Sequence, residues 1–434
     1  MSPVKYTASA IDMLRSEARI ICVLGPADFG GLARIKERLG RLASAGPAAR
    51  LGLRVDSTSR KWDYRPDMVC EDVTEIAPAT GYDVGDRLAE LSRSASTEVP
   101  VRARLAGEYL LLDLSHGLSD AVLPIELLAF LADPAESPDL PAWATARTVR
   151  CPLPRALASW MVHNPMKVFD VLYGKFRKAP HAGQSPALQS TALQSTALQS
   201  TAAEPTDGHR IPWTRSPAVV AATSSAGATK ALRAWRDDNL PDVSVTSILS
   251  AAVASAFRAR GIATSNSAAF LFDCRRYLRG TGGVVLGNFA VGIDFDGVDL
   301  TNATDVHRHV THAIDKGRPL AAGALSALMY LRTRASLPVI ATDSAPSSAC
   351  ANLTFSDVGR LRQLESIAWT DDPSRRSFYP LSEPSFPETI VVTSMHLRDT
   401  FHASASFHDN FFDRDIVQSA MDLAMKDPVA LLSA

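Results

Sequence analysis

A short tandem repeat near the middle of the chain limits how its 434 residues can fold. Residues 182–203 carry no charged side chain, and within them the pentapeptide ALQST occurs three times in succession, from Ala187 to Thr201. A period of five matches neither the helical period of about 3.6 nor the strand period of about 2, so no apolar face can form. A segment rich in Ser, Thr, Gln and Ala is typical of a linker. We therefore predict two folded domains, residues 1–180 and 212–434, joined by a flexible linker at 181–211.

Charge and cysteine content exclude several classes of protein. The formal net charge is -1, which provides no non-specific attraction to nucleic acid or acidic membranes. No run approaches the ~18 apolar residues that span a bilayer, and the charged N-terminus lacks a signal-peptide core. The five cysteines are scattered without a CxxC pair, which indicates neither a disulfide framework nor a zinc site. We expect a cytoplasmic monomer with no membrane span, no bound metal and no nucleic-acid partner.

Both halves mix strand and helix patterns, which predicts an α/β fold with two layers docked across a cleft. In the first half we expect strands at 101–106 and 108–114 joined at Gly107, then a helix over 120–131 whose regular part Pro124 delays. In the second half we expect strands at 217–223, 268–274, 284–295, 350–355, 389–397 and 401–407. Helices are expected at 229–239, 245–260, 304–316 and 413–425, with a loop-rich stretch between 317 and 349.

The chemistry of the chain is predicted to centre on residues 115–120 (SHGLSD). The apolar strand EYLLLDL leads directly into His116, so a rigid strand would hold the imidazole at its end. Gly117 would leave room for a bound substrate beside the ring. A histidine with a pKa near ~6.5 can take a proton from an attacking hydroxyl or amine and return it to a departing thiolate. His116 is therefore the candidate general base for acyl transfer from a thioester.

Asp120 is the second candidate catalytic-site residue, and its charge decides where it points. A carboxylate beside His116 would raise the pKa of the imidazole and weaken it as a neutral base. We therefore expect Asp120 to turn away from His116 and to pair with an arginine.

These residues, with two later segments, resemble motifs of the chloramphenicol acetyltransferase-like superfamily. Residues 115–120 resemble its HxxxD motif, 272–278 (FDCRRYL) with 286–289 (LGNF) resemble its D-x-R and GN-F segment, and 352–360 (NLTFSDVGR) resemble the SNxG or DFGWG stretch. The superfamily includes plant BAHD acyltransferases, peptide-synthetase condensation domains and mycobacterial polyketide-associated acyltransferases. Order and spacing of the three segments agree, and together they span most of the chain.

The resemblance implies two similar domains, each a mixed sheet with flanking helices, around a central channel. Donor and acceptor would enter from opposite faces and meet at His116. It also implies that Arg275 is the partner of Asp120. No cofactor would be resident: acyl-CoA or a phosphopantetheinyl carrier protein would be the co-substrate, and the acceptor would be a small molecule, typical of specialised metabolism.

The oxyanion formed during acyl transfer needs a donor across the channel, for which the second half offers three candidates. Thr354 and Ser356 alternate with Phe355 on a predicted strand, so both hydroxyls face one side; Ser356 ranks first because it is nearer the turn that Gly359 would form. Thr354 is assigned to substrate binding. The amide of Asn288 is the third candidate, although supporting a strand bulge is the favoured role for it.

Departures from the family pattern weaken the condensation-domain interpretation and favour a stand-alone acyltransferase, but they leave the choice of donor open. Ser115 stands where many relatives have a first histidine, and Ala121 where they have glycine. A carrier-protein-dependent condensation enzyme would need a basic docking face, for which Lys167, Lys175, Arg177 and Lys178 are candidates, although a solvated helix end is the favoured explanation of this stretch. A catalytically silent docking module of the same fold is the other alternative, although the presence of His116 argues against it.

Overall fold

The computed structural model describes residues 4–81, 83–94, 99–166, 210–279, 282–340, 342–370 and 375–433. The predicted linker lies outside this part of the chain, except for Arg210 and Ile211, and so does the basic stretch from Lys167 to Lys178. Arg210 and Ile211 are not linker: they belong to the short strand β8 (Arg210–Pro212), which pairs with β12 (Ser344–Pro346).

The first of two large sheets has five strands in the order β14-β2-β7-β6-β5. Their bounds are Ser377–Leu381, Arg19–Gly25, Tyr109–Ser115, Val101–Ala106 and Asp72–Glu75. The predicted hairpin is confirmed: β6 and β7 pair as antiparallel neighbours, and Gly107 takes the positive φ of 67° that the turn requires. Every residue of β7 is buried, so the strand that leads to His116 is fixed on both faces.

The second sheet has six strands in the order β11-β10-β13-β15-β16-β9. Their bounds are Ala290–Asp296, Ala263–Asp273, Cys350–Arg360, Thr389–Leu397, Thr400–His408 and Pro217–Thr223. The central strand β13 runs parallel to both β10 and β15, whereas the outer pairs are antiparallel. The prediction of an α/β chain with two mixed sheets is therefore confirmed.

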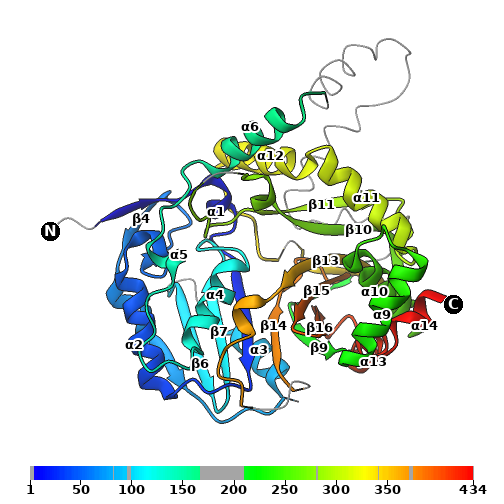
Figure 1. Cartoon of the computed structure of the whole chain (residues 1–434), viewed down its shortest axis with the longest axis horizontal. Coiled ribbons are helices and arrows are strands. Elements are labelled where there is room, and N and C mark those ends of the chain that lie inside the picture. Colours follow the sequence, from blue (N-terminus) through cyan, green and yellow to red (C-terminus); the bar gives the residue numbers. More distant parts are fainter. Residues whose placement is uncertain are drawn as a thin grey trace.

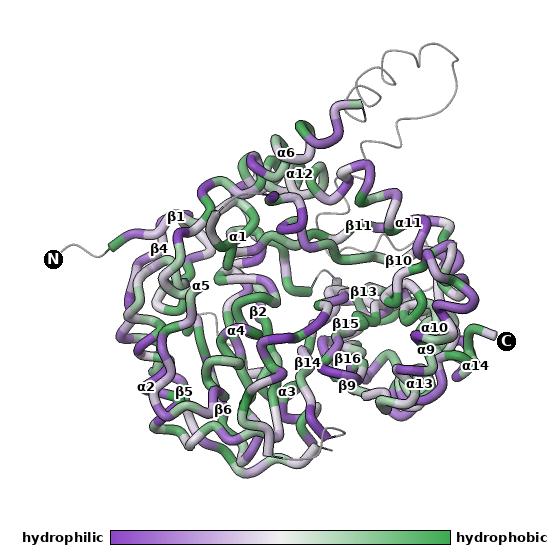
Figure 2. The backbone as a smooth tube through the Cα atoms, viewed as in Figure 1, coloured by the Kyte–Doolittle hydropathy of each residue, from purple (hydrophilic) through white to green (hydrophobic). Residues whose placement is uncertain are grey.

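Helices cover the two sheets and create separate cores (Figure 1). In the first half these are α1 (Ala10–Leu14), α2 (Gly31–Ser44), α3 (Val84–Arg93), α4 (Val122–Leu131), α5 (Ala142–Thr145) and α6 (Pro152–His163). In the second half they are α9 (Ala226–Asn239), α10 (Val245–Ala259), α11 (Ala303–Asp315), α12 (Arg318–Thr333), α13 (Arg414–Lys426) and α14 (Pro428–Ser433). Figure 2 shows hydrophilic and hydrophobic residues alternating along outer helices such as α2, whose buried side faces the first core. Apolar burial thus holds each layer in place.

The minor elements complete the chain. Strands β1 (Lys5–Thr7), β3 (Leu53–Arg54) and β4 (Lys61–Tyr64) form a small third sheet. Short 3-10 helices lie at η1 (Pro47–Ala49), η2 (Pro66–Cys70), η3 (Cys274–Tyr277) and η4 (Arg362–Leu364). In the described part of the chain, no helix is long and apolar enough to cross a membrane.

Segments cross between the two halves, 1–180 and 212–434, into which the sequence analysis divided the chain. β14 comes from the second half but pairs with β2 at the edge of the first sheet, and Figure 1 shows it in orange among the blue and cyan strands. In the opposite direction, α6 packs against α12 and η3 of the second half. A boundary in sequence is therefore not a boundary between the two sheets.

Two further expectations were wrong. Residues 318–333 were expected to lie in a loop-rich stretch, but they form α12. Gly317 precedes this helix in the left-handed conformation, and Pro319 lies in its first turn, where proline is favoured. The strand expected from 284 starts only at Ala290. Residues 285–289 instead form a loop that supplies contacts to the site described next.

Candidate active site

His116 is held by its backbone and by one ring nitrogen. Its amide donates to the carbonyl of Ala18 at 2.8 Å, and its carbonyl accepts from Nδ2 of Asn288 at 2.6 Å. Nδ1 of the ring lies 2.8 Å from the carbonyl oxygen of Ser119. A carbonyl can only accept, so Nδ1 carries the proton and the lone pair of the neutral ring is on Nε2.

The surroundings of His116 keep the imidazole neutral. Burial lowers the pKa of His116 from its ordinary value, and the positive charge of Arg15 lowers it further. A neutral ring with a free Nε2 is the form that can act as a base near neutral pH.

Asp120 turns away from this ring, as predicted, and forms a bidentate pair with Arg275. Oδ2 and Oδ1 accept from the two terminal guanidinium nitrogens at 2.9 and 3.0 Å. The same carboxylate accepts from the amide of Phe289 at 2.9 Å. Arg275 also donates to the carbonyls of Val285 and Gly287. The pair thus ties the HxxxD loop of the first half to the 285–289 loop of the second.

A second ion pair under the loop was missed by the sequence analysis. Arg50, almost fully buried, lies 3.1 Å from the Asp12 carboxylate and donates to the carbonyls of Gly117 and Leu118. Asp12 also accepts from the backbone and side-chain amides of Asn288, at 3.0 and 3.1 Å. The available signal was a lone carboxylate at position 12 among apolar residues of a short helix, since a buried charge needs a partner.

Asn288 has a different role from those considered in the sequence analysis. It lies in the loop before β11, not in a strand bulge, and both hydrogens of its amide are used, on Asp12 and on the His116 carbonyl. The amide is therefore not available as an oxyanion donor. Asn288 positions the backbone of His116.

Gly117 was expected to leave room for a substrate, and this was wrong. A Cβ at this position would lie 3.1 Å from Cα of Ser16 and from Val55, and 3.2 Å from Trp62. The missing side chain therefore permits close packing of the loop against the protein. Gly117 does not border either of the cavities that reach His116.

Two cavities meet at His116. One has a volume of about 280 Å3 and is bordered by the start of α4, by η3 and by the end of β13. The other has about 480 Å3 and is bordered by the segment before β2 and by the loops 337–340 and 382–385. The lining residues common to both are Arg15, Ile20, His116, Leu271, Ser356 and Ser382. The two cavities thus meet at a surface that includes His116 and Ser356.

β13 presents its hydroxyl groups to these cavities, as its alternation predicted. Thr354 and Ser356 line the larger cavity, and Ser356 lines both, while Phe355 packs into the second core. No described residue hydrogen-bonds either hydroxyl, so both are available to a substrate. Gly359 was expected to form a turn. It has a positive φ of 76°, but it lies at a bulge between β13 and β15.

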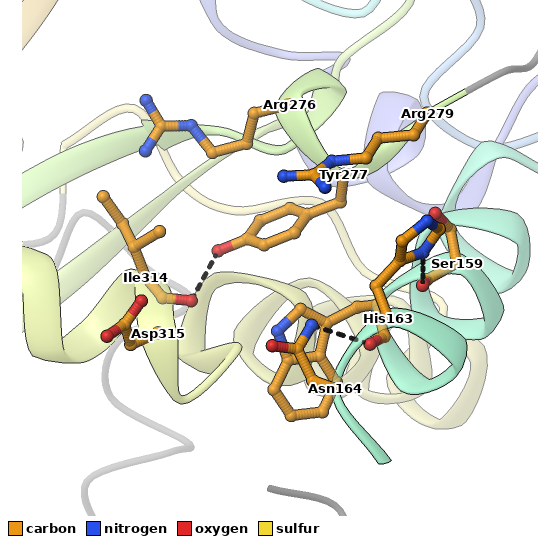
Figure 3. A pocket seen from close by; sticks show the side chains of 9 residues that line it. Ser159, His163, Asn164, Arg276, Tyr277, Arg279, Ile314 and Asp315 are labelled. Carbon is orange, nitrogen blue, oxygen red and sulfur yellow. Dashed lines mark hydrogen bonds between the residues drawn. The ribbon is translucent and has the colours of Figure 1, made fainter. Parts of the chain in front are cut away.

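A third cavity, of about 320 Å3, lies away from His116 between α6, η3 and the end of α11 (Figure 3). Arg276, Tyr277 and Trp160 border it, and the Tyr277 hydroxyl donates to the carbonyl of Ile314. It shares no lining residue with the two cavities at His116.

Comparison with known proteins places the whole chain in one structural group. No protein-family model and no curated protein matches the sequence. Trichothecene 15-O-acetyltransferase from Fusarium sporotrichioides is 12% identical, with 97% of this chain and 95% of that one covered and a TM-score of 0.57. The condensation domain of the Monacolin K polyketide synthase MokA is 12% identical, with 99% of this chain and 97% of that one covered and a TM-score of 0.56. F. sporotrichioides TRI101, solved in complex with coenzyme A and T-2, is 14% identical, with 95% of this chain and 96% of that one covered and a TM-score of 0.52. The likeness shows that the chain shares their fold.

Proposed function

We propose that this chain, which has the chloramphenicol acetyltransferase-like fold, is an acyltransferase that moves an acyl group from a thioester to a hydroxyl or amine. The observation that carries the proposal is the position of His116. No described residue hydrogen-bonds its Nε2, burial lowers the pKa of its ring, and it lies where two cavities meet. The group that acyl transfer from a thioester requires from the protein is a base at the point where donor and acceptor meet.

The reaction proceeds in two steps. Nε2 of His116 takes the proton of the acceptor as the acceptor's oxygen or nitrogen bonds to the thioester carbonyl carbon. The carbonyl oxygen becomes an oxyanion, which the Ser356 hydroxyl stabilises by donating a hydrogen bond; none of the described residues uses this hydroxyl. The intermediate then loses the thiolate as the C–S bond breaks, and Nε2 returns the proton to sulfur. No covalent enzyme intermediate forms.

Asp120 and Arg275 are positioning residues in this mechanism and take no part in the proton transfer. Their pair does not touch His116; it joins the loops of the two halves that hold His116 in place. Asn288 contributes in the same way through the carbonyl of His116.

The donor is proposed to be acyl-CoA, since one relative of the same fold was solved with coenzyme A, and the acceptor a small molecule of specialised metabolism, as in the trichothecene enzyme. An acyl group on a phosphopantetheinyl carrier protein is the alternative donor. It offers the same thioester to His116, so the two donors have to be separated by experiment.

The test measures thiol release from a panel of acyl-CoA donors, with and without added alcohols and amines, and in parallel from acyl-loaded carrier protein. His116→Ala is expected to lower turnover ~10²-fold or more with the fold intact. His312→Ala, at an exposed histidine of α11, is the matched control and should keep wild-type turnover. Activity of His116→Ala near that of the control would refute the proposed base. Turnover with carrier protein alone would favour the condensation enzyme, and binding without turnover the silent module.

A further inference from the structure

Arg15 differs from the other arginines that line the two cavities at His116, because no described carboxylate pairs with it. It ends α1, is half-buried, and lines both cavities together with His116. Among the described residues, none forms a hydrogen bond or ion pair with its guanidinium. Burial lowers the pKa of Arg15 to about 10, so the group is still a cation at neutral pH.

Every other arginine that lines either cavity has a carboxylate partner. These pairs are Arg19 with Asp113, Arg215 with Glu383, Arg275 with Asp120, and Arg360 with Glu365. Glu17 lies two residues beyond Arg15 and borders the larger cavity, but it is exposed and forms no ion pair among the described residues. A cation removed from water without a counter-ion is unfavourable. The presence of Arg15 where the two cavities meet is explained if a ligand supplies the missing anion.

We propose that Arg15 binds a carboxylate carried by one of the two substrates, on the acyl chain or on the acceptor. The inference rests on the proposed function, because it takes the two cavities to be the substrate arms. A guanidinium matches a carboxylate in shape and can donate two parallel hydrogen bonds to it. The phosphates of coenzyme A are not the ligand, since they lie at the far end of the pantetheine arm from the thioester that must reach His116.

The charge of Arg15 also affects the base. The cation lowers the pKa of His116 and opposes the formation of an imidazolium beside it. A substrate carboxylate bound to Arg15 neutralises this effect before the proton is transferred. Binding of the correct substrate would thus return the pKa of His116 towards its ordinary value and favour the imidazolium that forms as the proton is transferred.

The test measures binding, by isothermal titration calorimetry, with two matched pairs of probes. Succinyl-CoA and butyryl-CoA have acyl chains of equal length and differ in a terminal carboxylate; hexanoate and hexanamide make the same comparison for the acceptor arm. The wild-type protein is expected to bind the carboxylate member of one pair at least about tenfold more tightly. Arg15→Gln should abolish that preference. Arg276→Gln, at an exposed arginine of the separate cavity in Figure 3, should retain it.

The outcomes separate this inference from the proposed function. His116→Ala should keep the carboxylate preference, so a failure of catalysis leaves the binding test intact. The inference is overturned if neither pair shows a preference in the wild-type protein, or if the preference survives in Arg15→Gln. It is also overturned if Arg15→Gln lowers only kcat with the neutral donor, since Arg15 would then serve the transition state. The melting temperature gives a further readout: it should stay level or rise in Arg15→Gln, because an uncompensated charge is removed, whereas a purely structural arginine would lower it.

Discussion

Replacing Asp120 with asparagine tests whether the pair with Arg275 joins the two halves. The side chains of Asp120 and Arg275 are only 10% and 19% exposed, so screening by water is weak. Both oxygens of Asp120 accept from N–H donors, including the Phe289 amide. Either orientation of an asparagine would therefore turn its NH2 group towards a donor.

The expected loss can be worked out from these contacts. Removing one partner of a buried pair costs ~3–5 kcal/mol, but Arg275 would keep Asp273, at 3.0 Å, and two backbone carbonyls. We therefore expect the lower end of that range, about 3 kcal/mol. Urea unfolding followed by tryptophan fluorescence measures the free energy of unfolding.

Asp273→Asn is the matched control. Asp273 pairs with the same guanidinium at nearly the same distance, but its side chain is 52% exposed, and asparagine keeps an acceptor for the Arg275 amide that Asp273 caps. Its loss should be below ~1 kcal/mol. A double-mutant cycle of Asp120→Asn with Arg275→Met isolates the pairwise free energy. Equal losses at Asp120 and Asp273, or a pairwise free energy near zero, would refute the reasoning.

Three further changes test the site and the linker. Ser356→Ala should lower kcat ~10²-fold with little change in the KM of the donor, because the hydrogen bond from Ser356 to the oxyanion forms in the transition state. The control Ser394→Ala should leave kcat unchanged, because the Ser394 hydroxyl already donates to a carboxylate. Equal kcat values for the two variants would remove Ser356 from the mechanism. With butyryl-CoA, kcat/KM should fall as the pH drops through a His116 pKa below ~6.5. Arg15→Gln should move that fall to higher pH, because losing the nearby cation raises the pKa; an unmoved profile would show that the two groups are not coupled. Deleting one or two ALQST units from residues 187–201 should change the melting temperature by no more than ~1–2 °C, because loop entropy varies slowly with length, and a large loss would show that the segment packs.

The sequence alone was sufficient wherever the signal was local. The turn at Gly107 and the apolar run of β7 fix the hairpin that carries His116, and the alternation of β13 fixes the shared side of Thr354 and Ser356. These follow from backbone periodicity, which neighbours in sequence determine. The electrostatic argument that Asp120 should leave the imidazole also needed no structure, and the family resemblance supplied Arg275 as its partner.

Tertiary structure decided what depends on neighbours distant in sequence. Pairing of β14 with β2 follows from a free sheet edge in the folded first half, and no pattern within 377–381 encodes that edge. The smallness of Gly117 could be read as space for a substrate until Trp62 and Val55 were seen to fill it. Arg15 is one arginine among many in the sequence; only the folded channel, by pairing every other lining arginine with a carboxylate, leaves this one without a counter-ion beside His116. A missing partner is a property of the assembled surroundings, because charge compensation acts through space and not along the chain.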